Sequence, residues 1–217
     1  MGGRILVFLH IAAMNQAYDV VRDIVHAIHF SGLYERVDRI RCFMAVLDEG
    51  VASRIRGLLA RSGARFELVQ EAPNDTSYER LTLLRIFDFV RPEDRILYLH
   101  SKGVSDRNVH NPNVHDWTYM MTYFLIGHFG WCLDRLSDHD VVGCNAGQDH
   151  CSGNFWWARG DYFLRLPREI GPGYWDPELA FLFRAGPRVC QPHGSGIDHY
   201  QTAYPPSAYV DGPGPPA

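Results

Sequence analysis

Short apolar runs alternate with helically spaced apolar residues in the first half of the chain. The run from Arg4 to Leu9 predicts a strand, and the spacing of Val20, Ile24 and Ile28 predicts a helix over 15–31. The same alternation predicts strands over 38–47, 65–69 and 95–99 and helices over 48–59 and 78–90, with Asp48 and Thr76 as the expected capping residues of these helices. Because strands alternate with helices, we expect a three-layer α/β domain with a mostly parallel central sheet.

The second half of the chain has shorter apolar runs and more turn residues. It predicts a helix over 116–136, strands over 141–145, 153–159 and 188–191, and a short helix from Asp161 to Pro167. Asp176 is placed to cap a further helix, with Pro177 at its first position. The expected sheet therefore has six to seven strands. Residues 210–217 are rich in Pro and Gly and predict a disordered end or a linker, which leaves 1–209 as the domain.

The segment RILYLHSKG, residues 95–103, changes abruptly from apolar to polar. Ligands of open α/β sheets bind beyond the carboxyl ends of the strands, so His100, Ser101 and Lys102 are candidate binding residues. If the sheet has the common strand order 3-2-1-4, His10 after the first strand lies beside His100. Either histidine alone could be a core residue, but two of them at adjacent strand ends favour a site.

Composition narrows the classes of function. The formal net charge is −4 and the arginines are scattered, which argues against a nucleic-acid partner. Lys102 is the single lysine of the chain, and its compact ammonium suits a phosphate or carboxylate. Five widely spaced cysteines predict reduced core residues in a cytoplasmic protein. The apolar run at the amino terminus is too short for a membrane span or a signal sequence.

Several segments carry a resemblance to a known family, in the order HIAAMN, SYERLTLLRIFDF, ILYLHSKGVS, DVVGCNAG, SGNFWWARGDYFLRLP and HYQTAYPPSAY. Over residues 4 to 209 the chain resembles small GT-A glycosyltransferases, which include stand-alone bacterial enzymes and domains encoded by large DNA viruses such as chlorella viruses. The HSKG-type and SGNFWWA-type segments are its most specific parts. The resemblance implies a Rossmann-like GT-A fold and transfer of a sugar from a nucleotide donor, a UDP-sugar by preference, to a hydroxyl of a glycan or other acceptor.

The resemblance also implies which residues contact the substrates. The ring of Tyr78 could stack on uracil or pack in the core, and Trp156 and Trp157 alternate across one strand, so at most one of them faces the site. Small polar residues before that strand suit the close approach of a sugar. The expected donor contacts are His10, Asn15, Tyr78, Glu79, Thr82, His100, Ser101 and Lys102, and the expected sugar or acceptor contacts are Ser152, Gly153, Asn154 and Trp156.

The sequence departs from the GT-A pattern at the usual metal site. Most members of this fold place an Asp-x-Asp after the fourth strand, whereas this chain has His100, Ser101 and Lys102 there. The diphosphate could be neutralised by Lys102, by an arginine, or by a metal held by histidines such as His100 and His193. We therefore expect Mn²⁺ or Mg²⁺ to be helpful or dispensable.

An inverting transfer needs a carboxylate that removes the proton of the acceptor hydroxyl. Asp176 and Glu178 resemble the acidic helix start that supplies this base in inverting GT-A enzymes, although Asp176 could simply cap the predicted helix. Asp149 is the next candidate. Two alternative functions remain open at this point: a glycan- or nucleotide-binding module without catalysis, and a nucleotidyltransferase of the same architecture.

Overall fold

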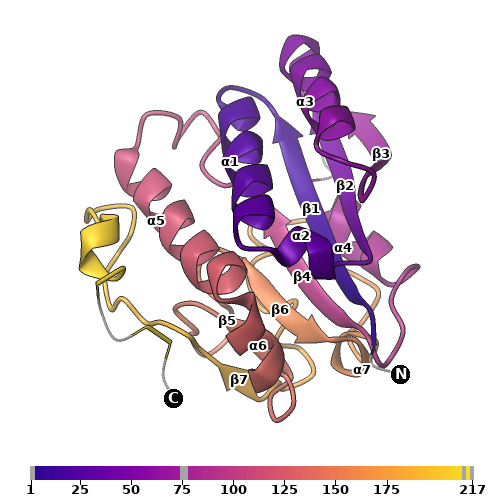
Figure 1. The fold of residues 1–217 in the computed structure, drawn as a ribbon, viewed down its shortest axis with the longest axis vertical. Coiled ribbons are helices and arrows are strands. Elements are labelled where there is room, and N and C mark those ends of the chain that lie inside the picture. The colour runs from indigo at the N-terminus through magenta and orange to yellow at the C-terminus, as the bar shows by residue number, and fades with distance from the viewer. Residues whose placement is uncertain (1–2, 74–77, 212–213, 216–217) are drawn as a thin grey trace.

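The computed structural model describes residues 3–73, 78–211 and 214–215, which form a seven-stranded sheet with helices on both faces (Figure 1). The strand order is β3-β2-β1-β4-β6-β5-β7. The strands are β1 Ile5–Ala13, β2 Arg39–Val46, β3 Phe66–Pro73, β4 Arg95–His100, β5 Val141–Gly143, β6 Trp156–Arg159 and β7 Val189–Cys190. The helices are α1 Ala17–Phe30, α2 Leu33–Arg36, α3 Glu49–Arg61, α4 Arg80–Ile86, α5 Pro112–Thr122, η1 Tyr123–Gly127, α6 Phe129–Arg135, α7 Gly160–Phe163 and η2 Pro206–Ala208. The expected α/β class, with a mostly parallel sheet, is confirmed.

The sheet separates two apolar layers. Alternate residues of β1 point to opposite faces, so that Val7 and Leu9 pack toward α1, α3 and α5, while Leu6 and Phe8 pack toward α4 and α7. Figure 1 shows the first group of helices in front of the sheet and the second behind it. β1 and β4 are parallel neighbours, as the predicted order 3-2-1-4 requires.

The first half of the chain follows its local pattern closely. Asp48 caps α3, as predicted, by accepting a hydrogen bond of 3.0 Å from the Val51 backbone N–H. β1 is longer than expected, since it pairs with β2 as far as Ala13. His10 therefore lies within the strand and not after its end. The predicted capping residue Thr76 lies outside the described residues, and α4 begins at Arg80.

The helix expected over 116–136 is divided into three parts. It starts earlier, at Pro112 after the Asn111 cap, and a π-helical turn, η1, separates α5 from α6. The strand expected from Gly153 begins only at Trp156 and runs antiparallel to both β4 and β5. Gly153 and Asn154 instead form a turn in which both have positive φ angles, 89° and 54°.

No helix follows Asp176 in the described residues, so the helix predicted there is wrong. Residues 174–185 form consecutive turns, and Ala180 has a φ angle of 62°, which a right-handed helix excludes. Burial of Phe181 and Leu182 against the second apolar layer decides the path of this segment. The Tyr162 hydroxyl also donates to the Leu182 carbonyl, which a regular helix would use internally.

The cysteines and tryptophans complete the core. All five cysteines are free thiols and four of them are buried. Trp156 and Trp157 point to opposite faces of the sheet, as expected from strand alternation, but both are buried, at 1% and 0% exposure. The Trp156 ring stacks on Tyr98 inside the core, so the expected contact of Trp156 with a sugar stays a prediction.

Candidate functional site

Two histidines meet where β1 and β4 run side by side. His10 and His100 are direct partners in the parallel register, so their side chains point to the same face of the sheet, toward α4. Ser101 turns the chain back across β1, because its hydroxyl accepts a hydrogen bond of 2.8 Å from the Ala12 backbone N–H. The sheet thus brings together the polar residues that the sequence singled out on two separate strands.

His10 is the more deeply placed of the pair. Its Nδ1 lies 2.9 Å from the Thr82 hydroxyl of α4, and both residues are buried. Burial lowers the pKa of His10 to about 4, so the ring is neutral at pH 7. His10 and Thr82 therefore form a buried pair that joins β1 to α4.

His100 is fixed by the turn that precedes β6. Its Nε2 lies 2.9 Å from the Gly153 carbonyl oxygen. Burial, with the nearby Lys102 charge as a smaller cause, lowers the pKa of His100 to about 4. A neutral imidazole that bonds to a carbonyl must carry its hydrogen on the bonded nitrogen. His100 therefore donates from Nε2 and leaves Nδ1 with a free lone pair.

Glu79, just before α4, is the hub of a hydrogen-bond network. Its Oε2 accepts from the Tyr98 hydroxyl and from Asn154 Nδ2, each at 2.6 Å. Asn154 Oδ1 in turn accepts from Trp156 Nε1 at 2.9 Å, which holds the turn in its left-handed conformation. Burial, followed by the charge of Glu79, raises the pKa of Tyr98, so Tyr98 stays protonated and donates.

Glu178 completes the site from the second half of the chain. Its Oε1 accepts from the Gly153 backbone N–H at 3.1 Å. The Gly153 residue is thus held on both sides, by Glu178 at its N–H and by His100 at its carbonyl. A Cβ atom at Gly153 would come within 2.5 Å of Met121 Sδ, and its φ of 89° also favours glycine.

Lys102 lies at the same edge, over the aromatic ring of Trp117. Its Nζ lies 4.0 Å from the centre of the Trp117 ring, which stacks on His199 with centroids 5.1 Å apart. Lys102 is only 7% exposed, and within the described residues its ammonium has no ion pair. Trp117 Nε1 and His199 Nδ1 are buried without a hydrogen-bond partner there. His199 lies in the HYQTAYPPSAY segment of the resemblance, but neither His199 nor Trp117 was predicted as a site residue.

Asn15 and Tyr78 are the remaining predicted donor contacts. Asn15, with a φ of 47°, ties the end of β1 to the loop after β4 through bonds to the Val104 carbonyl and Asp106. Tyr78, with a φ of 41°, is half-buried and packs edge-on against Tyr174 at 5.1 Å. Non-glycine residues with positive φ are uncommon, and here they gather around the strand ends.

The three candidate bases differ in their surroundings. Glu178 lies in the network already described. Asp176 is not a helix cap; its Oδ2 accepts from the Gly173 backbone N–H at 2.7 Å and so closes a local turn. Asp149 is 60% exposed and pairs with its neighbour His150 at 2.6 Å, while Ser152 lies beside it, partly exposed. The structure brings Glu178, and not Asp149 or Asp176, into contact with Gly153.

The predicted metal ligands do not come together. His193 stacks on Phe124 and bonds to the Tyr204 hydroxyl, with no contact to His100. Within the described residues, no group of three or more His, Cys, Asp or Glu side chains could hold a metal ion. A divalent cation here would need the donor diphosphate as a ligand in addition to a carboxylate.

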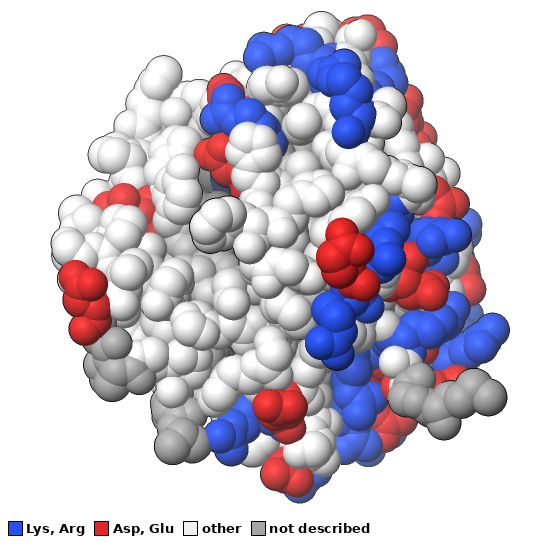
Figure 2. Space-filling model, viewed as in Figure 1, with Lys and Arg blue, Asp and Glu red and all other residues white. Residues whose placement is uncertain are grey.

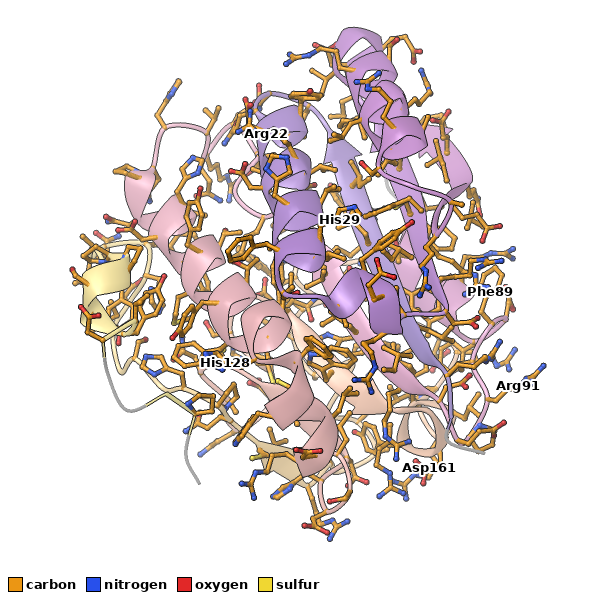
Figure 3. The ribbon with its side chains drawn as sticks, in the orientation of Figure 1. Arg22, His29, Phe89, Arg91, His128 and Asp161 are labelled. Atoms are coloured by element: carbon orange, nitrogen blue, oxygen red, sulfur yellow. The ribbon has the colours of Figure 1, made fainter. Side chains whose placement is uncertain are left out.

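A cavity of about 720 Å³ lies elsewhere, between α1 and α5. Its lining is mixed: apolar residues of α1 lie beside Asp23, Tyr119 and several histidines and threonines, and Phe30 is 97% exposed. Figure 3 shows Arg22 and His29 along α1, and Figure 2 shows that charged side chains are sparse over this face. We place the candidate site at the strand ends, where Glu79, His100 and Glu178 are joined through the turn at 153–154 by hydrogen bonds.

Comparisons with known proteins give a likeness of fold only. No protein-family model and no curated protein matches the chain. Among solved structures, 4-diphosphocytidyl-2C-methyl-D-erythritol synthase matches with a TM-score of 0.51 and 11% identity over 97% of each chain. Rv0371c from Mycobacterium tuberculosis H37Rv matches with a TM-score of 0.49 and 13% identity over 89% of each chain. An active-site variant of LgtC matches with a TM-score of 0.47 and 10% identity over 85% of this chain and 72% of LgtC.

The synthase match shows a shared α/β fold. The structural matches do not support the expected likeness to glycosyltransferase domains of large DNA viruses. A structure of Rv0371c in complex with manganese also matches, with a TM-score of 0.47. None of the helices in the described ranges has the length and apolar character needed to cross a membrane.

Proposed function

We propose that this protein is a glycosyltransferase that uses a nucleotide sugar, a UDP-sugar by preference, as donor and a glycan or other hydroxyl compound as acceptor. The observation that carries the proposal is the convergence of Lys102, His100, Glu79 and Glu178 at the carboxyl ends of β1 and β4. This edge is where α/β sheets bind nucleotides. The resemblance of the HSKG and SGNFWWA segments to glycosyltransferases supports the choice of reaction.

Lys102 is the proposed partner of the diphosphate. Its ammonium is held against the Trp117 ring without a carboxylate among its described neighbours, so an incoming phosphate would supply the missing negative charge. The same charge would stabilise the nucleoside diphosphate as it leaves. Because the residues present do not form a cation site by themselves, the proposal assigns no step to a metal.

Glu178 is the proposed base of an inverting transfer. In that reaction the acceptor oxygen attacks the anomeric carbon, the bond from that carbon to the diphosphate oxygen breaks, and the acceptor proton passes to the carboxylate. One oxygen of Glu178 is engaged by the Gly153 N–H, which orients the carboxylate and leaves Oε2 for the acceptor.

Replacing the lysine tests the donor site. We expect Lys102→Ala to bind UDP more weakly by about 1.5 to 3 kcal/mol, because a hydrogen bond to a charged group is lost. Isothermal titration calorimetry on the folded variant measures this. Arg54→Ala is the matched control, since Arg54 also lies over an aromatic ring, Tyr18, at 4.1 Å, but on α3. Equal UDP affinity in Lys102→Ala and the parent would refute the assignment.

A nucleotidyltransferase is the second candidate, favoured by the fold shared with 4-diphosphocytidyl-2C-methyl-D-erythritol synthase. The two reactions release different products. Incubation with nucleoside triphosphates plus a sugar phosphate, and separately with nucleotide sugars plus glycans, distinguishes them: pyrophosphate release supports the second candidate, and UDP release supports ours. Tight nucleotide binding without either product would indicate a binding module.

A further inference from the structure

One place in the network has two hydrogen-bond acceptors facing each other. Glu79 Oε1 and His100 Nδ1 are 3.8 Å apart, and their side chains keep 17% and 11% exposure. This pair is separate from the contacts that hold the two residues in position, which use Glu79 Oε2 and His100 Nε2. The question is which hydrogens satisfy the two remaining atoms.

The histidine side of the pair is an acceptor because of its other bond. The Gly153 carbonyl can only accept, so His100 Nε2 carries the ring hydrogen. The buried ring is neutral, and Nδ1 therefore presents a lone pair toward Glu79.

The two carboxylate oxygens of Glu79 also differ in their hydrogen bonds. Oε2 already receives hydrogens from Tyr98 and Asn154, whereas Oε1 receives none from the described residues. Two lone-pair atoms in a mostly buried place favour a ligand that brings hydrogens to both. Water can do so in the free protein, and a ligand that displaces it must offer the same hydrogens.

We propose that Glu79 Oε1 and His100 Nδ1 together bind a vicinal diol of the nucleotide sugar, each accepting one hydroxyl hydrogen. The two oxygens of a diol sit on adjacent carbons, so both can lie within hydrogen-bond distance of two acceptors 3.8 Å apart. The diol belongs either to the ribose or to the transferred sugar. This inference rests on the proposed function and adds the group that the site selects.

The pair would distinguish ligands that carry the diol from those that lack it. A site built to hydrogen-bond a hydroxyl rejects the analogue that lacks it, because its buried acceptors are then left unpaired. We expect removal of the diol to weaken binding by about 10- to 100-fold. Glu79 is here a binding residue toward the ligand and a positioning residue toward Asn154.

Binding measurements with deoxy analogues test the proposal. UDP and 2′,3′-dideoxy-UDP probe the ribose, and a UDP-hexose with its 2-deoxy and 3-deoxy analogues probes the sugar. Each ligand is titrated into the parent protein, Glu79→Gln and His100→Gln. The second variant keeps a donor near the Gly153 carbonyl while removing the Nδ1 acceptor, so it serves if Glu79→Gln does not fold. In the parent we expect the 10- to 100-fold loss in one series, and in the variants a loss below about 3-fold.

Each other outcome overturns the inference. If UDP binds and every deoxy analogue binds as tightly as its parent ligand, Glu79 and His100 do not bind a diol, although the proposed function stands. If no nucleotide or nucleotide sugar binds, the proposed function fails and this inference fails with it. If chelator removes the discrimination, a cation lies between the two acceptors. Nitrogen-15 NMR of His100 gives an independent reading, since a hydrogen on Nδ1 at pH 7 would also contradict the proposal.

Discussion

The two halves of the sheet are built by different means. From β1 to β4 the strands have six to nine residues, and buried apolar side chains cover both faces of β1, β2 and β4. From β5 to β7 the strands have two to four residues, and the chain between them consists mainly of turns. Two hydrogen bonds hold the turn at 153–154 against the first half: Asn154 donates to Glu79, and His100 donates to the Gly153 carbonyl. The first half therefore supplies most of the core together with the proposed donor contacts Glu79, His100 and Lys102, whereas the second half supplies turns and the proposed base Glu178.

The largest expected effect is on the first half. Ile24 lies on the buried face of α1 and is 1% exposed. We expect Ile24→Ala to lower the free energy of unfolding by about 2 to 5 kcal/mol, because it leaves a cavity in the core. Denaturant unfolding measures the loss. The folded fraction should bind UDP as the parent does; weaker binding would show that the scaffold and the site are not separable in this way.

The second prediction concerns the base in the second half. Glu178→Gln should reduce turnover by about 10² or more, which is about 2.7 kcal/mol, while the protein stays folded. The amide can still accept from the Gly153 N–H but cannot take the acceptor proton. Transfer assays and thermal unfolding are measured together, with Glu169→Gln as the control because Glu169 is an exposed acid of the same region. Turnover within a few-fold of the parent would place the base elsewhere or indicate a retaining enzyme.

The third prediction concerns how the free energy of unfolding depends on pH through His10 and His100. His10 and His100 have folded-state pKa values of about 4, below the ordinary value of 6.5, because they are buried. The unfolded chain therefore binds more protons between these values, and the free energy of unfolding should fall as pH decreases from about 6.5 toward 4. The expected slope is about 1.4 kcal/mol per pH unit for each histidine.

Urea unfolding between pH 5 and 7 measures this slope, above the range in which carboxylates dominate. His100→Gln should remove about half of it, since Gln does not titrate yet can still donate to the Gly153 carbonyl. An unchanged slope in that variant would mean that His100 is already charged in the folded protein.

The smallest expected effect is at Asp176. Because it closes a turn by accepting from the Gly173 N–H, Asp176→Asn should lower stability by about 1 kcal/mol or less and leave turnover within a few-fold of the parent. Side-by-side melting and transfer assays decide this. A loss of turnover comparable with that of Glu178→Gln would exchange the roles of the two acids.

Local sequence signals explain which expectations were met. The parallel strands and α3 with its Asp48 cap were predictable, because burial on both faces and a capping side chain leave a local pattern. The adjacency of His10 and His100 followed from a general rule for strand order. The path of 174–185 was not predictable, since Asp176, Pro177 and Glu178 have the local signature of a helix start while Phe181 and Leu182 are drawn into the core.

The amino-acid sequence by itself determined the α/β class, the strand end at His100 and the singular position of Lys102. These depend on periodicity and composition, which act between residues close in the chain. Only the tertiary structure decided that Glu79, His100 and Gly153 form one network, that Glu178 reaches it, and that Trp117 and His199 stack beside Lys102. Those contacts join residues 15 to 82 positions apart, and the directions of their hydrogen bonds are set by packing that no local pattern encodes.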